Sequence, residues 1–142
     1  CPASVIEADG VKAVASTADL FKACQIVSLH IPATAETKQS INYSLLSLMP
    51  KGALLINTAR KEVIYEEDLA RILEDRTDFH YVADVAPTIA DTLKEKFGNR
   101  IFFTPKKMGA QTSEANINAG IAAARQSVGY LKDSIDKFRV NK

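Results

Sequence analysis

The sequence has few cysteines and no long apolar run, and each absence narrows the class of protein. Cys1 and Cys24 are the only cysteines, and they lack the spacing of metal ligands. Cys24 lies at a predicted helix-to-strand junction, so we expect a buried, reduced thiol and a cytoplasmic protein. No apolar run approaches the roughly 18 residues of a spanning helix. No signal-peptide pattern opens the chain, so we expect no membrane partner. Because the cysteines lack the spacing of metal ligands, we also expect no metal site.

Neither sign of charge predominates. The 142 residues include 18 basic and 17 acidic side chains, for a formal net charge of +1. Such a balance gives no electrostatic basis for binding nucleic acid or an anionic membrane. The length suits one domain with a real core. The sequence also contains no internal repeat, low-complexity segment or linker.

Apolar runs of strand length alternate with amphipathic stretches along the chain. Glu66–Arg76 is the clearest helix, because Leu69, Ile72 and Leu73 recur on one face. We predict helices over residues 2–10, 18–23, 43–49, 66–76, 92–97 and 113–137, and strands over residues 11–14, 25–32, 53–60, 79–85 and 101–104. This alternation predicts an α/β fold, a partial doubly wound parallel sheet with helices on both faces.

The predicted C-terminal helix carries one apolar stripe. Its members recur at spacings of four and three residues: Ile117, Ile121, Ala124, Val128, Leu131, Ile135 and Phe138. Thr112 or Ser113 would cap this helix. Gly120 and Gly129 each lower its helicity by roughly 1 kcal/mol, so packing against the sheet or another domain must hold it.

Residues 53–60, read as ALLINTAR, are the stretch around which the chain is organised. The apolar run fits a strand buried on both faces, and Arg60 follows at its carboxyl end, where ligands bind in open α/β sheets. A guanidinium at this place suits a carboxylate or a polarised carbonyl. The alternative is a surface arginine that pairs with a neighbour such as Glu62.

Four predicted strands end in the same way, and this favours the functional interpretation of Arg60. Each carries a polar residue and then a turn, in the segments 30–32, 57–60, 84–87 and 104–107. In a doubly wound sheet these ends line one crevice. We therefore expect Arg60 to face a binding cleft.

These segments resemble the D-isomer-specific 2-hydroxyacid dehydrogenase family. The resemblance rests on residues in the family's order: Leu29-His30-Ile31-Pro32, Thr34, Thr37, Met49-Pro50-Lys51-Gly52, Ile56-Asn57-Thr58-Ala59-Arg60, Val63, Ile64, Glu66, Leu69, Asp84-Val85, Thr104-Pro105, Gly109-Ala110, Thr112, Glu114 and Ala115. It covers almost all of the chain. Within the family, it is greatest to the short phosphoglycerate dehydrogenases.

The resemblance implies hydride transfer between NAD and carbon 2 of a D-2-hydroxy acid, here 3-phosphoglycerate in serine synthesis. By similarity, Arg60 would hold the substrate carboxylate and carbonyl. The residues expected at the cofactor are His30, Ile31 and Pro32 on the adenosine side, Thr58, Ala59, Arg60 and Asp84 by the nicotinamide, and Gly109 and Ala110, whose backbone would approach the ring. Asp84 would accept a hydrogen bond from the carboxamide, and the family implies a homodimer.

The chain departs from the family pattern at the acid–base residue. Lys106 and Lys107 follow Thr104-Pro105 where the family has a histidine, and Ile89 falls near the position of its glutamate partner. A lysine pKa must fall from about 10.4 for the group to act near neutrality, and burial and nearby cations such as Arg60 lower it. We hypothesise that one of the two lysines is the proton carrier, with Lys107 preferred.

The chain also lacks the glycine-rich turn that binds a pyrophosphate. Its six glycines form no G-x-G-x-x-G, and the first residue is cysteine. We expect residues 1–112 to be the later part of an NAD-binding domain and residues 113–142 a C-terminal helix and tail. Alone, this piece is expected to bind NAD weakly and turn over nothing. The alternatives are a hydroxypyruvate or lactate type of dehydrogenase, or a non-catalytic, NAD-sensing member.

Overall fold

A computed structural model describes residues 2–104 and 112–137, which divide into two compact units, Cys1–Lys106 and Lys107–Lys142. The first unit alternates strands with helices, as predicted. Its helices are α1 (Ala3–Ala8), α2 (Thr17–Ala23), α3 (Tyr43–Leu46), α4 (Glu66–Asp75) and α5 (Ala90–Phe97), with short 3-10 turns η1 (Lys61–Val63) and η2 (Gly98–Arg100). Its strands are β1 (Ile26–Leu29), β2 (Leu54–Asn57), β3 (His80–Ala83) and β4 (Ile101–Phe103).

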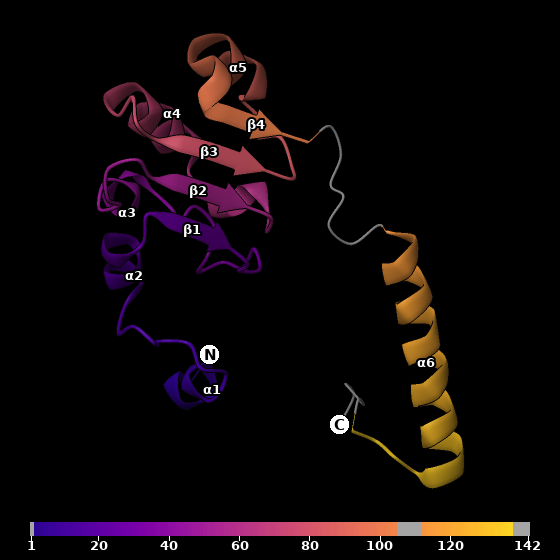
Figure 1. Ribbon diagram of the computed structural model, residues 1–142. Coiled ribbons are helices and arrows are strands. Elements are labelled where there is room, and N and C mark those ends of the chain that lie inside the picture. The colour runs from indigo at the N-terminus through magenta and orange to yellow at the C-terminus, as the bar shows by residue number, and fades with distance from the viewer. Residues whose placement is uncertain (1, 105–111, 138–142) are drawn as a thin grey trace. The chain divides into compact units, whose positions relative to one another are not determined.

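The four strands form one parallel sheet in the order β1-β2-β3-β4 (Figure 1). This confirms the predicted α/β class and parallel sheet. Each crossover contains one α-helix, and a parallel crossover is right-handed in nearly all proteins. Because the strand order never reverses, successive right-handed crossovers return on the same side of the sheet.

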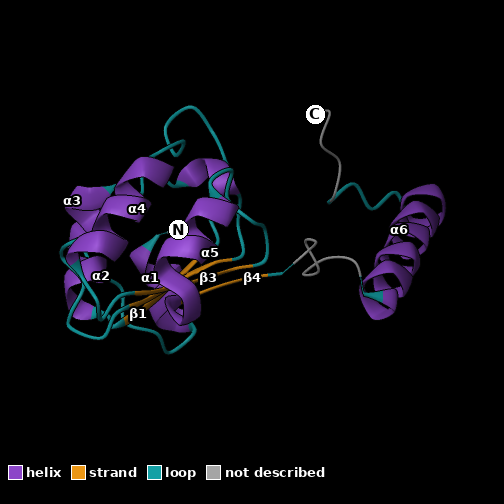
Figure 2. Ribbon diagram, turned by 90° about the horizontal axis from the view of Figure 1, so that it is seen from above, coloured by secondary structure: helices purple, strands orange, loops and turns teal. Residues whose placement is uncertain are grey.

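The crossover helices therefore cover one face of the sheet, where α3, α4 and α5 lie together (Figure 2), whereas α1 buries none of its residues. Leu55 and Tyr81 point into this core, and Leu69, Ile72 and Leu73 of α4 pack there as predicted. The opposite face is open in residues 2–104: Ile26 is 60% exposed and Phe102 59%. The expectation of helices on both faces, with β2 buried on both sides, is not met within this unit.

The predicted edge strand at residues 11–14 was wrong. These residues form no ladder in the structure, and Val11 is 58% exposed. A strand of four residues depends on a neighbouring strand, and the described chain offers residues 11–14 none. Cys24, expected to be buried, is a half-buried free thiol that packs against the core.

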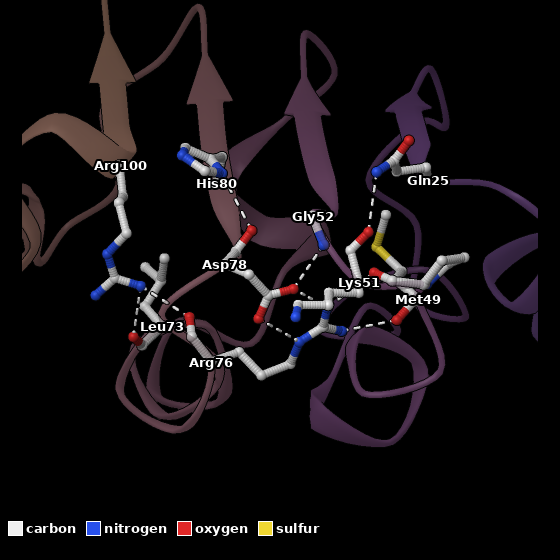
Figure 3. A network of polar contacts seen from close by, with 10 residues as sticks. Gln25, Met49, Lys51, Gly52, Leu73, Arg76, Asp78, His80 and Arg100 are labelled. Carbon is white, nitrogen blue, oxygen red and sulfur yellow. Dashed lines mark hydrogen bonds and ion pairs between the residues drawn. The ribbon is translucent and has the colours of Figure 1, made fainter.

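A polar network joins the elements at the amino ends of the strands (Figure 3). Arg76 donates to the carbonyls of Met49 and Pro50 at 2.7 and 2.8 Å, and to the carboxylate of Asp78 at 2.6 Å. Asp78 also accepts from the backbone N–H of Gly52 at 2.6 Å. The network fixes the end of α4 against the turn that leads into β2.

The second unit contains α6 (Ser113–Asp133). Thr112 caps it by accepting from the N–H of Ala115 at 3.1 Å, and Ser134 ends it in the left-handed conformation at φ 53°. The helix ends at Asp133, four residues before the predicted end. The described residues of the apolar stripe are exposed within their unit, with Leu131 at 80%, and Phe138 lies outside the described residues. Within the described ranges, no helix combines the length and apolarity needed to cross a bilayer.

Candidate functional site

The carboxyl ends of all four strands lie in one row of the sheet. Leu29 pairs with Asn57, Asn57 with Ala83, and Ala83 with Phe103. The next residue of each strand is polar, and these residues are His30, Thr58, Asp84 and Thr104. The structure thus brings together the four strand ends that the sequence predicted to line one crevice.

Arg60 ends the turn that follows β2. It is exposed, has an extended backbone at φ −132° and precedes η1. The described residues include no ion pair between Arg60 and Glu62, which was the alternative partner. The guanidinium is therefore available at the edge where the strands end.

Asp84 is held at this edge by its backbone. Its N–H donates to the carbonyl of Asn57 at 3.2 Å, and its carbonyl accepts from the hydroxyl of Thr104 at 2.8 Å. Both carboxylate oxygens are buried, yet neither accepts a hydrogen bond from a described residue. A buried, unpartnered carboxylate costs free energy, and a ligand that donates a hydrogen bond would satisfy it.

His30 lies exposed at the end of β1, between two hydroxyl groups. One ring nitrogen, Nε2, is 2.9 Å from the hydroxyl of Ser28, and Nδ1 is 3.4 Å from that of Thr58. Ile31 is half-buried against the core, whereas Pro32 is exposed and its carbonyl accepts from the hydroxyl of Thr37. These contacts support the ring of His30 from two strands.

The remaining predicted site residues cannot be placed. Lys106, Lys107, Gly109 and Ala110 lie outside the described residues. Among residues 2–104 and 112–137, no group of three histidine, cysteine, aspartate or glutamate side chains could hold a metal ion.

The loop after β3 is fixed to the start of α4. The carboxylate of Glu66 accepts from the N–H groups of Thr88 and Ile89 at 2.8 and 3.3 Å, and Lys61 donates to the hydroxyl of Thr88 at 3.3 Å. The backbone at Thr88 and Ile89 is therefore held against the start of α4.

Sequence reasoning missed the side chain that closes the Arg60 turn. Asn57 accepts from the N–H of Ala59 at 3.0 Å and donates to the carbonyl of Arg60 at 3.1 Å and to the hydroxyl of Tyr81 at 3.4 Å. An asparagine two residues before a turn N–H is a signal for such a closure. The contact with Tyr81 spans two strands and leaves no trace in the sequence.

Comparison with known proteins gives consistent matches. Residues 2–105 match a family model described as D-isomer specific 2-hydroxyacid dehydrogenase, NAD binding domain. The D-3-phosphoglycerate dehydrogenase of Haemophilus influenzae is 33% identical over an alignment of 136 residues that covers 92% of this chain and 33% of that protein. D-3-phosphoglycerate dehydrogenase 2, chloroplastic, of Arabidopsis thaliana is 36% identical over an alignment of 143 residues that covers 99% of this chain and 22% of that protein.

A solved structure is similar over nearly the whole chain. The crystal structure of cofactor (NAD+) bound 3-phosphoglycerate dehydrogenase in Entamoeba histolytica has a TM-score of 0.80 and 43% sequence identity, and the match covers 98% of this chain and 50% of that one. The chain thus spans a third or less of these two curated relatives and half of the solved chain.

Proposed function

The chain belongs to the D-isomer-specific 2-hydroxyacid dehydrogenase family, and we propose that its full-length protein transfers a hydride between NAD and a D-2-hydroxy acid. The family is one of NAD-dependent oxidoreductases, and the match covers its NAD-binding domain. When bound, NAD supplies the hydride chemistry, while the protein binds and orients the reactants. The observation that carries the proposal is the single row of strand ends, after which Asp84 directly follows β3 and Arg60 follows β2 by three residues.

Arg60 is proposed to bind the carboxylate and the carbonyl oxygen of the substrate. It is permanently charged, its two-pronged donor geometry suits a carboxylate, and no described acid pairs with it. It stands three residues after Asn57, whose partner in the adjacent strand, Ala83, directly precedes Asp84. The same positive charge would help lower the pKa of a nearby lysine.

Asp84 fits the nicotinamide end of NAD. Its two oxygens are buried acceptors without a described donor, and the carboxamide of nicotinamide has an N–H₂ group that would fill this need. We propose that His30, Ile31, Pro32, Thr58 and Ala59 contact the cofactor along the same edge, together with Gly109 and Ala110. Lys107, or Lys106, is proposed to accept the proton of the substrate's 2-hydroxyl group.

The proposed substrate is 3-phosphoglycerate, oxidised to 3-phosphohydroxypyruvate in serine biosynthesis. The support is that both curated relatives and the solved Entamoeba histolytica protein are named as phosphoglycerate dehydrogenases. We further propose a cytoplasmic location and a homodimer. Because the chain contains no glycine-rich pyrophosphate turn, we propose that on its own it binds NAD weakly and has no turnover.

The decisive experiment is a rate assay of the full-length protein with NADH and three 2-keto acids: phosphohydroxypyruvate, hydroxypyruvate and pyruvate. Oxidation of NADH fastest with phosphohydroxypyruvate supports the proposal. A preference for hydroxypyruvate or pyruvate would assign another substrate of the same family. Tight NADH binding without turnover of any of the three would instead support the non-catalytic, NAD-sensing alternative.

Substitutions in the full-length protein test the proposed roles of Arg60, Lys106 and Lys107. Arg60→Ala should lower kcat/KM for the keto acid about 100-fold, because the transition state loses a charged donor. Lys107→Ala and Lys106→Ala test the identity of the proton carrier, and near-normal turnover in both variants would exclude both lysines from that role.

Calorimetry of the 142-residue chain with NAD tests the proposal that the chain alone binds NAD weakly. A micromolar dissociation constant would contradict it.

A further inference from the structure

Asn57 stands out because its amide side chain is almost fully buried, at 2% exposure. It ends β2 on the face that packs against the helices, two residues after Leu55, which is 0% exposed. An apolar residue would be the ordinary choice at this position. A buried amide costs free energy unless its hydrogen bonds are made, so the hydrogen-bond partners of Asn57 indicate what its side chain holds in place.

Each polar atom of the Asn57 side chain is used. Its Oδ1 accepts from the N–H of Ala59, and its Nδ2 donates to the carbonyl of Arg60 and to the hydroxyl of Tyr81, at 3.0, 3.1 and 3.4 Å. The first two contacts bracket the peptide unit that joins Ala59 to Arg60. They fix the direction in which the chain leaves the strand, and so the direction of the Arg60 side chain.

Tyr81 holds the amide of Asn57 in one orientation. The ring is 1% exposed and packs edge-to-face on Phe103, with centroids 5.7 Å apart and planes at 62°. Burial raises the pKa of its hydroxyl to about 12, so this group keeps its proton at neutral pH. The hydroxyl therefore offers Asn57 a fixed acceptor in the adjacent strand.

The backbone of Asn57 serves the second predicted site residue. Its carbonyl accepts from the N–H of Asp84 at 3.2 Å, whereas its side chain holds the Arg60 turn. A substitution of the Asn57 side chain removes its contacts with the Arg60 turn. The hydrogen bond to Asp84 stays, because the main-chain carbonyl of residue 57 remains. The two functions can therefore be separated by experiment.

We propose that Asn57 is a positioning residue that, braced by Tyr81, directs Arg60 toward the carboxylate of the substrate. The inference rests on the proposed function, in which Arg60 binds that carboxylate. If so, removing the side chain of Asn57 or the hydroxyl of Tyr81 should weaken binding of the keto acid much more than binding of NADH.

The test compares Asn57→Ala, Tyr81→Phe and Leu55→Val in the full-length protein. Leu55→Val is the matched control, because it loosens the same face of the same strand without touching the turn. We expect Asn57→Ala to raise KM for the keto acid about tenfold, Tyr81→Phe to raise it less, and Leu55→Val to leave it unchanged. The dissociation constant for NADH should change less than threefold in all three variants.

A second measurement reports the turn directly, without turnover. Hydrogen exchange of the Ala59 amide should become at least tenfold faster in Asn57→Ala, while Leu55→Val should leave it close to the wild-type rate. Unchanged protection of Ala59 in a folded Asn57→Ala protein would overturn the proposal. An equal rise in KM in Leu55→Val would overturn it too, because general loosening would then explain the effect.

Arg60→Ala, assayed alongside, separates the substrate-binding role of Arg60 from the positioning role of Asn57. If Arg60→Ala leaves the rate unchanged, the proposed function of Arg60 is wrong. If Arg60→Ala lowers kcat/KM while Asn57→Ala does not, the role of Arg60 stands and the positioning role of Asn57 is wrong.

Discussion

Asp84 keeps both carboxylate oxygens buried at the edge of the sheet where the strands end, without a described donor. A buried charged group left unpaired destabilises the folded state, whereas a bound donor removes that cost. A residue that lowers stability in this way is expected where a ligand binds, because the ligand completes its hydrogen bonds. Stability and binding should therefore respond to Asp84 in opposite directions.

Asp84→Asn is predicted to raise the free energy of unfolding of the ligand-free, full-length protein by at least about 1 kcal/mol, because the buried charge is removed. The same change should weaken NADH binding about tenfold, since a charged acceptor is lost. Thermal unfolding and fluorescence titration measure the two effects. Asp91→Asn, on the exposed first turn of α5, is the control and should leave NADH binding unchanged. A loss of both stability and affinity in Asp84→Asn would contradict the argument.

Asp78 shows the opposite electrostatic situation. The guanidinium of Arg76 and the N–H of Gly52 hold the pKa of its carboxyl well below the ordinary value. A carboxyl whose pKa is lower in the folded state stabilises the fold above its unfolded pKa of about 3.9. This stabilisation is lost as the pH falls below that value.

Asp78→Asn should therefore lower the free energy of unfolding by about 2 kcal/mol at neutral pH, since charged hydrogen bonds are broken. The difference from the wild type should shrink progressively as the pH falls below about 4, because the wild type loses this stabilisation between the ordinary aspartate pKa of about 3.9 and the much lower pKa of folded Asp78. Urea unfolding at several pH values measures it. Glu74→Gln is the control, because its ion pair with Lys96 is exposed and should contribute less than about 1 kcal/mol. A difference that does not depend on pH would count against the ionic network.

At the scale of elements, the strand order explains both the site and the open face. Right-handed crossovers in one direction place α3, α4 and α5 on one side of the sheet. The register then aligns Leu29, Asn57, Ala83 and Phe103, so that the residues after them share one edge. The site is therefore a consequence of the topology, and no single loop builds it.

The start of α6 gives a local prediction. Thr112 satisfies the N–H of Ala115, and its replacement by alanine should remove about 1 kcal/mol of helix stability. Circular dichroism of a peptide covering residues 112–137 should record less helix for Thr112→Ala than for the wild type. Thr112→Ser keeps the hydroxyl and is the control. Equal helicity in the alanine and serine peptides would show that the cap has no effect.

At the scale of the whole molecule, the first unit leaves one face of its sheet uncovered by residues 2–104. Ile26 and Phe102 lie exposed there, and with Leu54 and Val82 they line a hollow of about 380 Å³. Large exposed apolar patches favour association. The chain also spans half or less of the relatives described above, which have additional residues that it lacks.

We predict that the 142-residue chain self-associates in solution, and that the double substitution Ile26→Thr and Phe102→Thr weakens association about tenfold. Threonine keeps a side chain suited to a strand but reduces the apolar surface. Sedimentation velocity over a range of concentrations measures the effect. Val11→Thr is the control, because Val11 is exposed outside the sheet. Monomeric behaviour of the unsubstituted chain at all concentrations would contradict the prediction.

Local patterns in the sequence were sufficient for the identity of most elements. The spacing of Leu69, Ile72 and Leu73 predicts the buried face of α4, and the apolar run before Asn57 predicts β2; both are confirmed. Ser16 is of a residue type that favours helix N-caps, and its hydroxyl accepts from the N–H of Asp19 at the start of α2. These features depend on neighbours along the chain, and so the sequence contains their signal.

Other features depend on residues far apart in the chain, and only the tertiary structure decided them. Residues 11–14 have a sequence typical of a strand, but no described strand pairs with them. The strand order left one face of the sheet open. The domain division and the proposed roles of Lys106 and Lys107 stay predictions.

The sequence by itself determined that polar residues end the strands, and on that pattern it predicts Arg60 and Asp84 as site residues. Packing decided which of the polar side chains have hydrogen-bond partners. The amide of Asn57 donates to the hydroxyl of Tyr81 in the adjacent strand, whereas the carboxylate of Asp84 accepts from none of the described donors. The physical reason is that a hydrogen bond between strands requires register and side-chain direction, which pairing sets and composition does not.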